Sequence, residues 1–171
     1  MILLVGLGNK GAEYHNTRHN IGFTLIDKLF EDHNFPNWKQ KFHSLITYNG
    51  NLILAKPMTY MNNSGHAIAE IMQFYKISIE NITIIDDGLD LPVGEVRDKC
   101  GGGTAGHNGL KSISLAIGQE YHRIRIGIGR PEHKHDVSNY VLGPFDNKEQ
   151  LVIDKVINDI MFNLSHKIEK S

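Results

Sequence analysis

The 171-residue sequence has few of the features that mark secreted, membrane-bound or disulfide-stabilised proteins. Its one cysteine, Cys100, cannot form an internal disulfide, which excludes a disulfide scaffold and favours a reducing compartment. The apolar runs are too short to span a bilayer, and no basic segment precedes the apolar residues 2–5. These absences predict a cytoplasmic protein that does not enter a membrane.

A large excess of positive charge is also missing. The net charge is −1 with histidine neutral, so the whole chain lacks the electrostatic signature of a nucleic-acid-binding protein. The segment from Arg97 to Lys134 differs, because it holds seven lysines and arginines and only three acidic residues. A solvated basic surface is the simpler interpretation of this segment, and local contact with nucleic acid is the alternative.

The hydrophobic pattern predicts one globular domain, residues 1–171, in which strands alternate with helices. Strands are expected at 2–6, 45–48, 52–55, 82–85, 93–99 and 123–129, the last half-buried, and helices at 20–33, 64–75, 110–117 and 147–168. Asn49 and Gly50 form the tight turn of a hairpin, and residues 86–90 form an acidic loop. This order indicates an α/β fold: a single-domain three-layer sandwich whose mixed β-sheet carries helices on both faces.

A glycine pattern after the first strand resembles a dinucleotide-binding fingerprint. Gly6, Gly8 and Gly11 match Gly-x-Gly-x-x-Gly. That motif requires a helix to begin at once, so that the helix N-terminus binds the pyrophosphate. A polar loop follows here instead, so nucleotide binding is disfavoured.

Metal and thiol chemistry are also disfavoured by the sequence. His15 and His19 are four residues apart, a spacing that places two metal ligands on one helix face, but no obvious third ligand accompanies them. Cys100 has no base or helix N-terminus beside it in the sequence, so it is interpreted as a structural thiol. We therefore predict no metal site.

The remaining candidate is a histidine base with a carboxylate partner. Polar loops follow several element ends, and such ends share one edge of an open α/β sheet. His19, paired with Asp86 or Asp87, would accept a proton from water while the carboxylate fixes its tautomer, a combination suited to ester hydrolysis. Amide donors in the same loops would bind a carbonyl oxygen or peptide groups, although each alone is more often a turn or cap residue: Asn9, Asn62 and Asn108.

With these residues assembled, the sequence closely resembles the bacterial peptidyl-tRNA hydrolase family over nearly its whole length. The matching strings, in chain order, are Val5-Gly6-Leu7-Gly8-Asn9, Thr17-Arg18-His19-Asn20-Ile21-Gly22, Lys56-Pro57-Met58-Thr59-Tyr60-Met61-Asn62, Asp87-Gly88-Leu89-Asp90-Leu91-Pro92, Gly101-Gly102-Gly103, Gly106-His107-Asn108-Gly109-Leu110-Lys111 and Arg123-Ile124-Arg125-Ile126-Gly127-Ile128-Gly129. An ordered set of this kind is highly specific.

The resemblance implies cofactor-free hydrolysis of the ester that joins a peptide to the 3′ ribose of tRNA, which recycles tRNA from stalled translation. It assigns three catalytic residues: His19 as the base, Asp87 as the group that orients it, and Asn9 as an amide donor. The expected substrate is peptidyl-tRNA, contacted at its acceptor stem, 3′ CCA end and peptide, and the expected state is a monomer.

The resemblance also assigns residues that bind the substrate. Asn62 and Asn108 match the family's substrate-binding amides, and Tyr14 and Met61 would wall the site. The resemblance further implies two residues that bind a tRNA phosphate, Lys99 and Arg125.

The sequence departs from the family pattern at several positions. Asp86 and Gly88 stand where the family often has histidine and glutamate, and a second carboxylate beside Asp87 is expected to raise the apparent pKa of that group. Thr104 and Ala105 replace a more usual His-Gly pair. The C-terminal helix is also expected to be shorter than in many relatives.

Two other functions stay open from the sequence. A non-catalytic RNA-binding module would use the basic segment but gives no reason for pairing His19 with Asp87. A different esterase would use the same groups on another ester.

Overall fold

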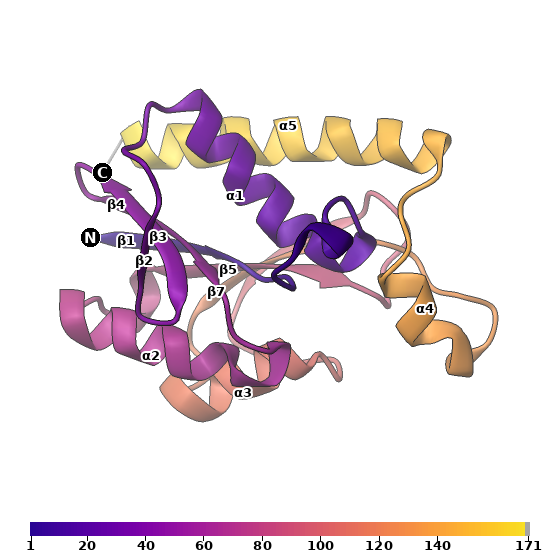
Figure 1. Cartoon of the computed structure of the whole chain (residues 1–171), viewed down its shortest axis with the longest axis horizontal. Helices are drawn as coiled ribbons and strands as arrows, with labels where there is room; N and C mark the ends of the chain where they lie inside the picture. The colour runs from indigo at the N-terminus through magenta and orange to yellow at the C-terminus, as the bar shows by residue number, and fades with distance from the viewer. Residues whose placement is uncertain (170–171) are drawn as a thin grey trace.

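A computed structural model describes residues 1–169 and confirms the three-layer α/β fold (Figure 1). Seven strands form one mixed sheet in the order β2-β3-β4-β1-β5-β7-β6. Their bounds are β1 Ile2–Gly6, β2 Lys39–Lys41, β3 Ser44–Asn49, β4 Leu52–Pro57, β5 Ile82–Gly88, β6 Val96–Cys100 and β7 His122–Gly127. The four central strands are parallel, while β2, β3 and β6 pair antiparallel with their neighbours.

Helices cover both faces of the sheet. Their bounds are α1 Ile21–Asp32, α2 Ser64–Tyr75, α3 Asn108–Ile117, α4 Val137–Val141 and α5 Asn147–Glu169. Helices α1 and α5 lie on one face, α2 and α3 on the other, and the short α4 stands beside one end of the sheet (Figure 1). No helix within residues 1–169 is long and apolar enough to cross a bilayer.

Each face of the sheet has its own hydrophobic core, built from the apolar stripe of its helices. On one side Leu25 and Ile157 pack with Ile124 of β7. On the other side Ile68 and Ile113 pack with residues of β1, β4 and β5. The sheet is therefore buried on both faces, and its strand ends are the places left for a site.

Three predicted strands differ from the observed ones. Strand β5 continues through Asp86 and Asp87, which were expected in a loop, because both carboxylates find partners inside the protein. Strand β7 is buried on both faces rather than half-buried, since Arg123 and Arg125 are only 0% and 7% exposed and have internal partners. Strand β6 begins at Val96, three residues later than expected, and neither β2 nor α4 was predicted.

Gly6 at the end of β1 and Gly22 in α1 have a packing role. A Cβ on Gly6 would lie 2.3 Å from the carbonyl oxygen of Gly22, and a Cβ on Gly22 would lie 2.4 Å from that of Ile85. The backbone of α1 therefore rests directly on β1 and β5. This contact holds His19, in the 3₁₀ turn Arg18–Asn20 before α1, near the carboxyl end of β5.

Candidate active site

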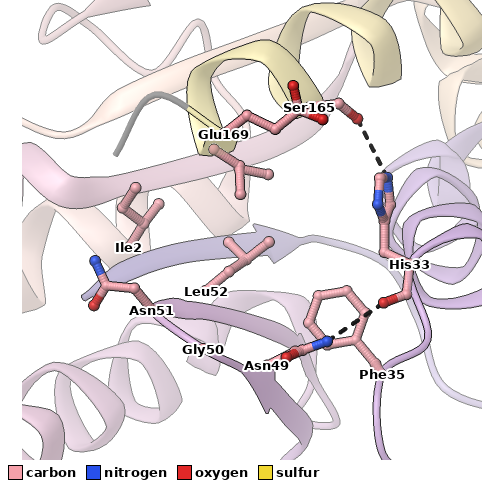
Figure 2. A pocket seen from close by; sticks show the side chains of 10 residues that line it. Ile2, His33, Phe35, Asn49, Gly50, Asn51, Leu52, Ser165 and Glu169 are labelled. Carbon is pink, nitrogen blue, oxygen red and sulfur yellow. Dashed lines mark hydrogen bonds between the residues drawn. The ribbon is translucent and has the colours of Figure 1, made fainter.

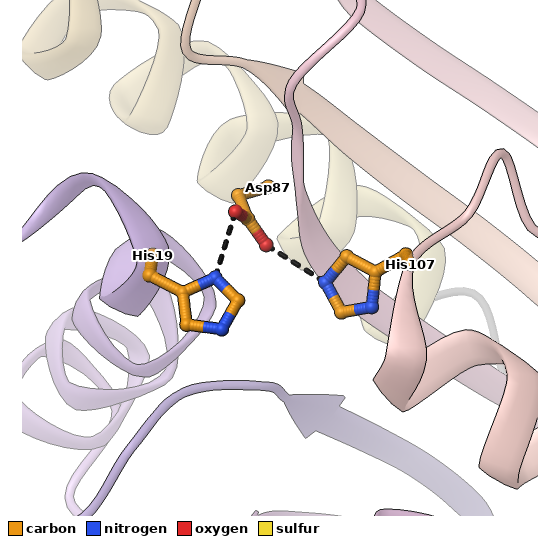
Figure 3. Close-up of side chains that lie close together, drawn as sticks. All are labelled: His19, Asp87 and His107. Carbon is orange, nitrogen blue, oxygen red and sulfur yellow. Dashed lines mark hydrogen bonds and ion pairs between the residues drawn. The ribbon is translucent and has the colours of Figure 1, made fainter. Parts of the chain in front are cut away.

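Two imidazoles and one carboxylate meet near the carboxyl end of β5 (Figure 3). His19 comes from the turn before α1, Asp87 from β5, and His107 from the residue that caps α3. Asp87 Oδ2 lies 2.8 Å from His19 Nδ1, and Oδ1 lies 2.8 Å from His107 Nε2. One carboxylate thus orients two rings.

The surroundings keep Asp87 ionised. Its side chain is 3% exposed, and burial by itself would raise the pKa of the carboxyl. Electrostatic interaction with His19 and His107, with the hydrogen bonds from both rings, outweighs burial and holds the pKa of Asp87 well below its ordinary value. Asp87 therefore stays negatively charged while it is hydrogen-bonded to His19.

His107 has a backbone role that fixes its tautomer. Its Nδ1 accepts hydrogen bonds from the backbone N–H groups of Gly109 at 3.1 Å and Leu110 at 3.3 Å, which caps α3. An Nδ1 that accepts must be unprotonated, so Nε2 carries the proton and donates it to Asp87. Burial lowers the pKa of His107 and the charge of Asp87 raises it, with a net rise, whereas the two backbone donors favour the neutral ring.

Asp86, next to Asp87 on β5, forms a separate buried pair with Arg125 of β7. It is 0% exposed, and Arg125 Nε donates to its Oδ2 at 3.1 Å. Within residues 1–169 its Oδ1 has no hydrogen-bond partner. Burial, aided by Asp87, raises the pKa of Asp86 to about 6, against the opposing charges of His107 and Arg125. The rise in pKa that was expected for Asp87 occurs at Asp86 instead. The expectation for Asp87 was wrong, because its interactions with the two imidazoles lower its pKa.

A pocket of about 260 Å³ brings together five of the predicted site residues. They are His19, Met61, Asp87, Asn108 and Arg125. The unpredicted α4 closes this pocket with Val137, Ser138 and Val141. Arg125 has little free surface here, because Nη1 also lies 3.4 Å from Asp90 and its side chain is 9% exposed.

The other predicted residues lie outside this pocket. Asn9 lines a pocket of about 510 Å³. Tyr14 is half-buried in the turn Ala12–Tyr14, and Asn62 is exposed in the turn Met61–Asn63. Lys99 is exposed on β6, with its ammonium against Gly102 of the glycine loop.

Two residues of the site were not assigned from the sequence. His107 was known only as part of a matching string, although a histidine between a glycine loop and a helix was a usable signal. Asn20 is buried, and its side chain accepts from the backbone N–H of Asn9 at 2.8 Å and donates to its carbonyl at 2.9 Å. Asn20 therefore fixes the backbone of Asn9.

The donor atoms of His19, Asp87 and His107 lie within 4.8 Å of one another, a spacing that would also suit a metal ion. The cap of α3 argues against one at this point. To ligate through Nε2, His107 would have to move its proton to Nδ1, where two backbone N–H groups already point. The geometry favours proton transfer chemistry.

A different pocket, of about 330 Å³, lies at the amino ends of β1 and β4 (Figure 2). His33 is central to it: its Nε2 lies 3.2 Å from Ser165 Oγ, and its carbonyl accepts from Asn49 Nδ2 at 3.5 Å. These contacts tie α1, α5 and the β3–β4 turn together. The parallel strands place their carboxyl ends, where α/β sheets bind ligands, on the opposite side.

Comparison with known proteins gives one family. Residues 3–171 match the family described as peptidyl-tRNA hydrolase. The chain is 49% identical to the peptidyl-tRNA hydrolase of Aliarcobacter butzleri over 92% of this chain and 86% of that protein. It is 45% identical to the peptidyl-tRNA hydrolase of Rickettsia bellii over 99% of this chain and 97% of that protein.

Solved structures agree with this result. The crystal structure of peptidyl-tRNA hydrolase from Acinetobacter baumannii matches with a TM-score of 0.92 and 40% identity, covering 96% of this chain and 87% of that one. The sequence match, the three-layer fold and the acid-histidine centre are consistent with one another. The chain belongs to the peptidyl-tRNA hydrolase family.

Proposed function

We propose that this protein hydrolyses the ester bond between a peptide and the 3′ ribose of tRNA, with His19 as the base that activates water. The hydrogen bond of 2.8 Å between His19 Nδ1 and Asp87 Oδ2 carries the proposal. In this bond Nδ1 carries the proton and donates it to the carboxylate, which leaves Nε2 with a lone pair. Within residues 1–169 that Nε2 makes no hydrogen bond, so it is available to water.

The reaction then follows from these two groups. Water attacks the ester carbonyl carbon while His19 Nε2 takes one of its protons, which produces a tetrahedral oxyanion. As the bond to the 3′ oxygen breaks, the imidazolium returns the proton to that oxygen. Asp87 stays ionised throughout and stabilises the imidazolium.

Amide donors would stabilise the oxyanion and hold the peptide. Asn108 lines the pocket of His19, and we propose that it donates to the substrate there. Asn9 and Asn62 are proposed as further amide contacts. Met61 and Tyr14 are proposed as walls for the terminal nucleotide and peptide.

We also propose contacts with the tRNA acceptor stem. Lys99 is exposed and free to meet a phosphate, whereas Arg125 would add only the edge of its guanidinium that Asp86 and Asp90 leave open. The proposed enzyme works as a monomer in the cytoplasm, where tRNA is found, since every proposed group comes from one chain. It needs no metal, because water activation is assigned to His19.

The test is release of labelled N-acetyl-aminoacyl groups from tRNA by the purified protein in the presence of EDTA. Release should persist in EDTA, vanish in His19→Ala and survive in the matched control His15→Ala, whose exposed histidine lies in the same loop. Normal turnover by His19→Ala would refute the base assignment. Binding of tRNA without release by the parent protein would favour the RNA-binding module instead.

A further inference from the structure

A second cluster of metal-ligand side chains lies away from the catalytic pocket. We propose that His43, His66 and Glu70 form a surface site for a divalent transition-metal ion of the zinc class. His43 Nδ1 lies 3.1 Å and His66 Nε2 lies 2.8 Å from the same oxygen, Glu70 Oε1. All three donor atoms lie within 4.8 Å of one another.

The two nitrogen-to-oxygen separations are close to those of a real site. Zinc binds imidazole nitrogen and carboxylate oxygen at about 2.0–2.2 Å in tetrahedral geometry, which puts neighbouring donors roughly 3.3 Å apart. The two nitrogen-to-oxygen distances are therefore within about 0.5 Å of the ligated spacing. Small side-chain movements would admit an ion that takes the place of the bridging protons.

The helical half of the cluster is rigidly placed. His66 and Glu70 are four residues apart on α2, so they share one helix face. The start of α2 is held by the backbone N–H of Gly65, which donates to Ser112 Oγ of α3 at 2.8 Å. A Cβ on Gly65 would lie 2.1 Å from the carbonyl oxygen of Ser112. Helix α2 therefore cannot shift easily on α3.

The third ligand comes from a fixed corner between β2 and β3. Phe42 and His43 both have positive φ, 55° and 54°, a conformation that costs energy in residues with a Cβ. Two contacts hold the corner. The His43 carbonyl accepts from the backbone N–H of Met58 at 2.8 Å. The centroid of the Phe42 ring lies 5.0 Å from that of the Phe74 ring. His43 is thus aimed at α2 before any ligand arrives.

The donor set decides the class of ion. Two imidazoles and one carboxylate suit zinc, nickel, cobalt or copper, whereas magnesium and calcium prefer oxygen ligands alone. The side chains of His43 and His66 are 59% and 67% exposed, so water would fill the remaining coordination positions. Unlike His107, neither ring caps a helix within the described chain, so each can move its proton to the other nitrogen.

The probe is Zn²⁺, titrated by calorimetry into the full chain without a histidine tag, after EDTA has been removed. The parent should bind one equivalent at this site and gain thermal stability that rises with the logarithm of free Zn²⁺ above the Kd. His66→Gln, Glu70→Gln and His43→Asn should each weaken that binding by more than about tenfold. Asparagine is chosen at position 43 because it tolerates positive φ.

Two controls make the result decisive. His166→Gln removes an exposed histidine on α5 and should bind as the parent does. All variants should keep ester hydrolysis, which shows that they are folded. The proposal is overturned if the parent binds no Zn²⁺, if the three variants bind unchanged, or if only His19→Ala loses binding, since the ion would then sit at the catalytic centre.

Discussion

Asp87 uses both carboxylate oxygens, one for each imidazole. Because each oxygen has a separate partner, the plane of the carboxylate is fixed, and with it the direction of the His19 ring. His107 contributes to this without needing to touch substrate. It is a positioning residue whose other nitrogen caps α3.

Substitution can separate the two roles of His107. His107→Asn should keep the helix cap, because asparagine is a good N-cap residue, but it should lose the bond to Asp87. A charge-assisted hydrogen bond contributes about 1.5–3 kcal/mol, so kcat should fall roughly 10- to 100-fold. The free energy of unfolding should change by less than in His107→Ala, which also loses the cap. Equal kcat in His107→Asn and the parent would contradict the positioning role.

The raised pKa of Asp86 predicts a pH-dependent stability. Its carboxyl titrates near 6 in the folded protein and near 3.8 unfolded, so between these values the folded state binds more protons. Stability from this group is therefore present at low pH and lost as pH rises through about 6. The difference between these two pKa values corresponds to about 3 kcal/mol.

The comparison that isolates this effect is urea unfolding of the parent and Asp86→Asn at several pH values. The variant keeps every other titratable side chain, so the difference between the two proteins reports Asp86. The parent should lose up to about 3 kcal/mol relative to the variant between pH 4 and pH 7. A difference that stays constant over this range would show that Asp86 keeps an ordinary pKa.

At the scale of elements, the contact between α1 and the sheet sets the active-site geometry. Gly22→Ala would push a methyl group against the carbonyl of Ile85, which lies in a central strand and cannot move aside. We expect a loss of about 1–3 kcal/mol and a lower kcat, since His19 moves with α1. Urea unfolding and ester release measure the two effects.

Gly103→Ala is the matched control for stability. A Cβ there meets nothing within 4 Å, and the residue does not have positive φ. Its free energy of unfolding should stay within about 0.5 kcal/mol of the parent. If Gly22→Ala were as stable as Gly103→Ala, the close approach of α1 would not be structurally important.

Elements with a clear apolar period were predicted well, and elements that bury charge were not. Helix α2 and the β3–β4 hairpin follow directly from periodicity and the Asn49-Gly50 turn. Strand β5 was ended too early because Asp86 and Asp87 look like loop residues until their partners are known. Those partners, Arg125 and His107, are distant in sequence, so local pattern carries no information about them.

The predicted site shows the same limit. His19 and Asp87 were assigned from chemistry and resemblance, and the structure brings them within 2.8 Å. Asn20 was not assigned, because its role is to hold the backbone of Asn9 eleven residues away. Such backbone support leaves no compositional signal.

Over the whole molecule, the positive segment is less exposed than its composition suggests. Arg123 is fully buried and donates to the carbonyls of Gly102, Gly103 and Gln119, and Arg125 faces two carboxylates. Salt-sensitive binding of tRNA should therefore depend on the exposed cations. Among them, Lys99 beside the glycine loop is the proposed phosphate contact.

Lys99→Ala should weaken tRNA binding and reduce the slope of log K against log salt by about one, the value for a single phosphate contact. Lys155→Ala is the control, because Lys155 is exposed on α5. Binding is measured by titration at several salt concentrations with His19→Ala as the background, so that the ester stays intact. Equal slopes in both variants would remove Lys99 from the interface.

The two edges of the sheet have a consequence for the protein at high concentration. Strand β2 is only Lys39–Lys41, and β6 carries Arg97, Asp98 and Lys99, with every residue of both strands exposed. A second chain that added a strand at either edge would press its backbone against charged groups that need water. The short charged edges therefore protect this enzyme from edge-to-edge aggregation in a crowded solution.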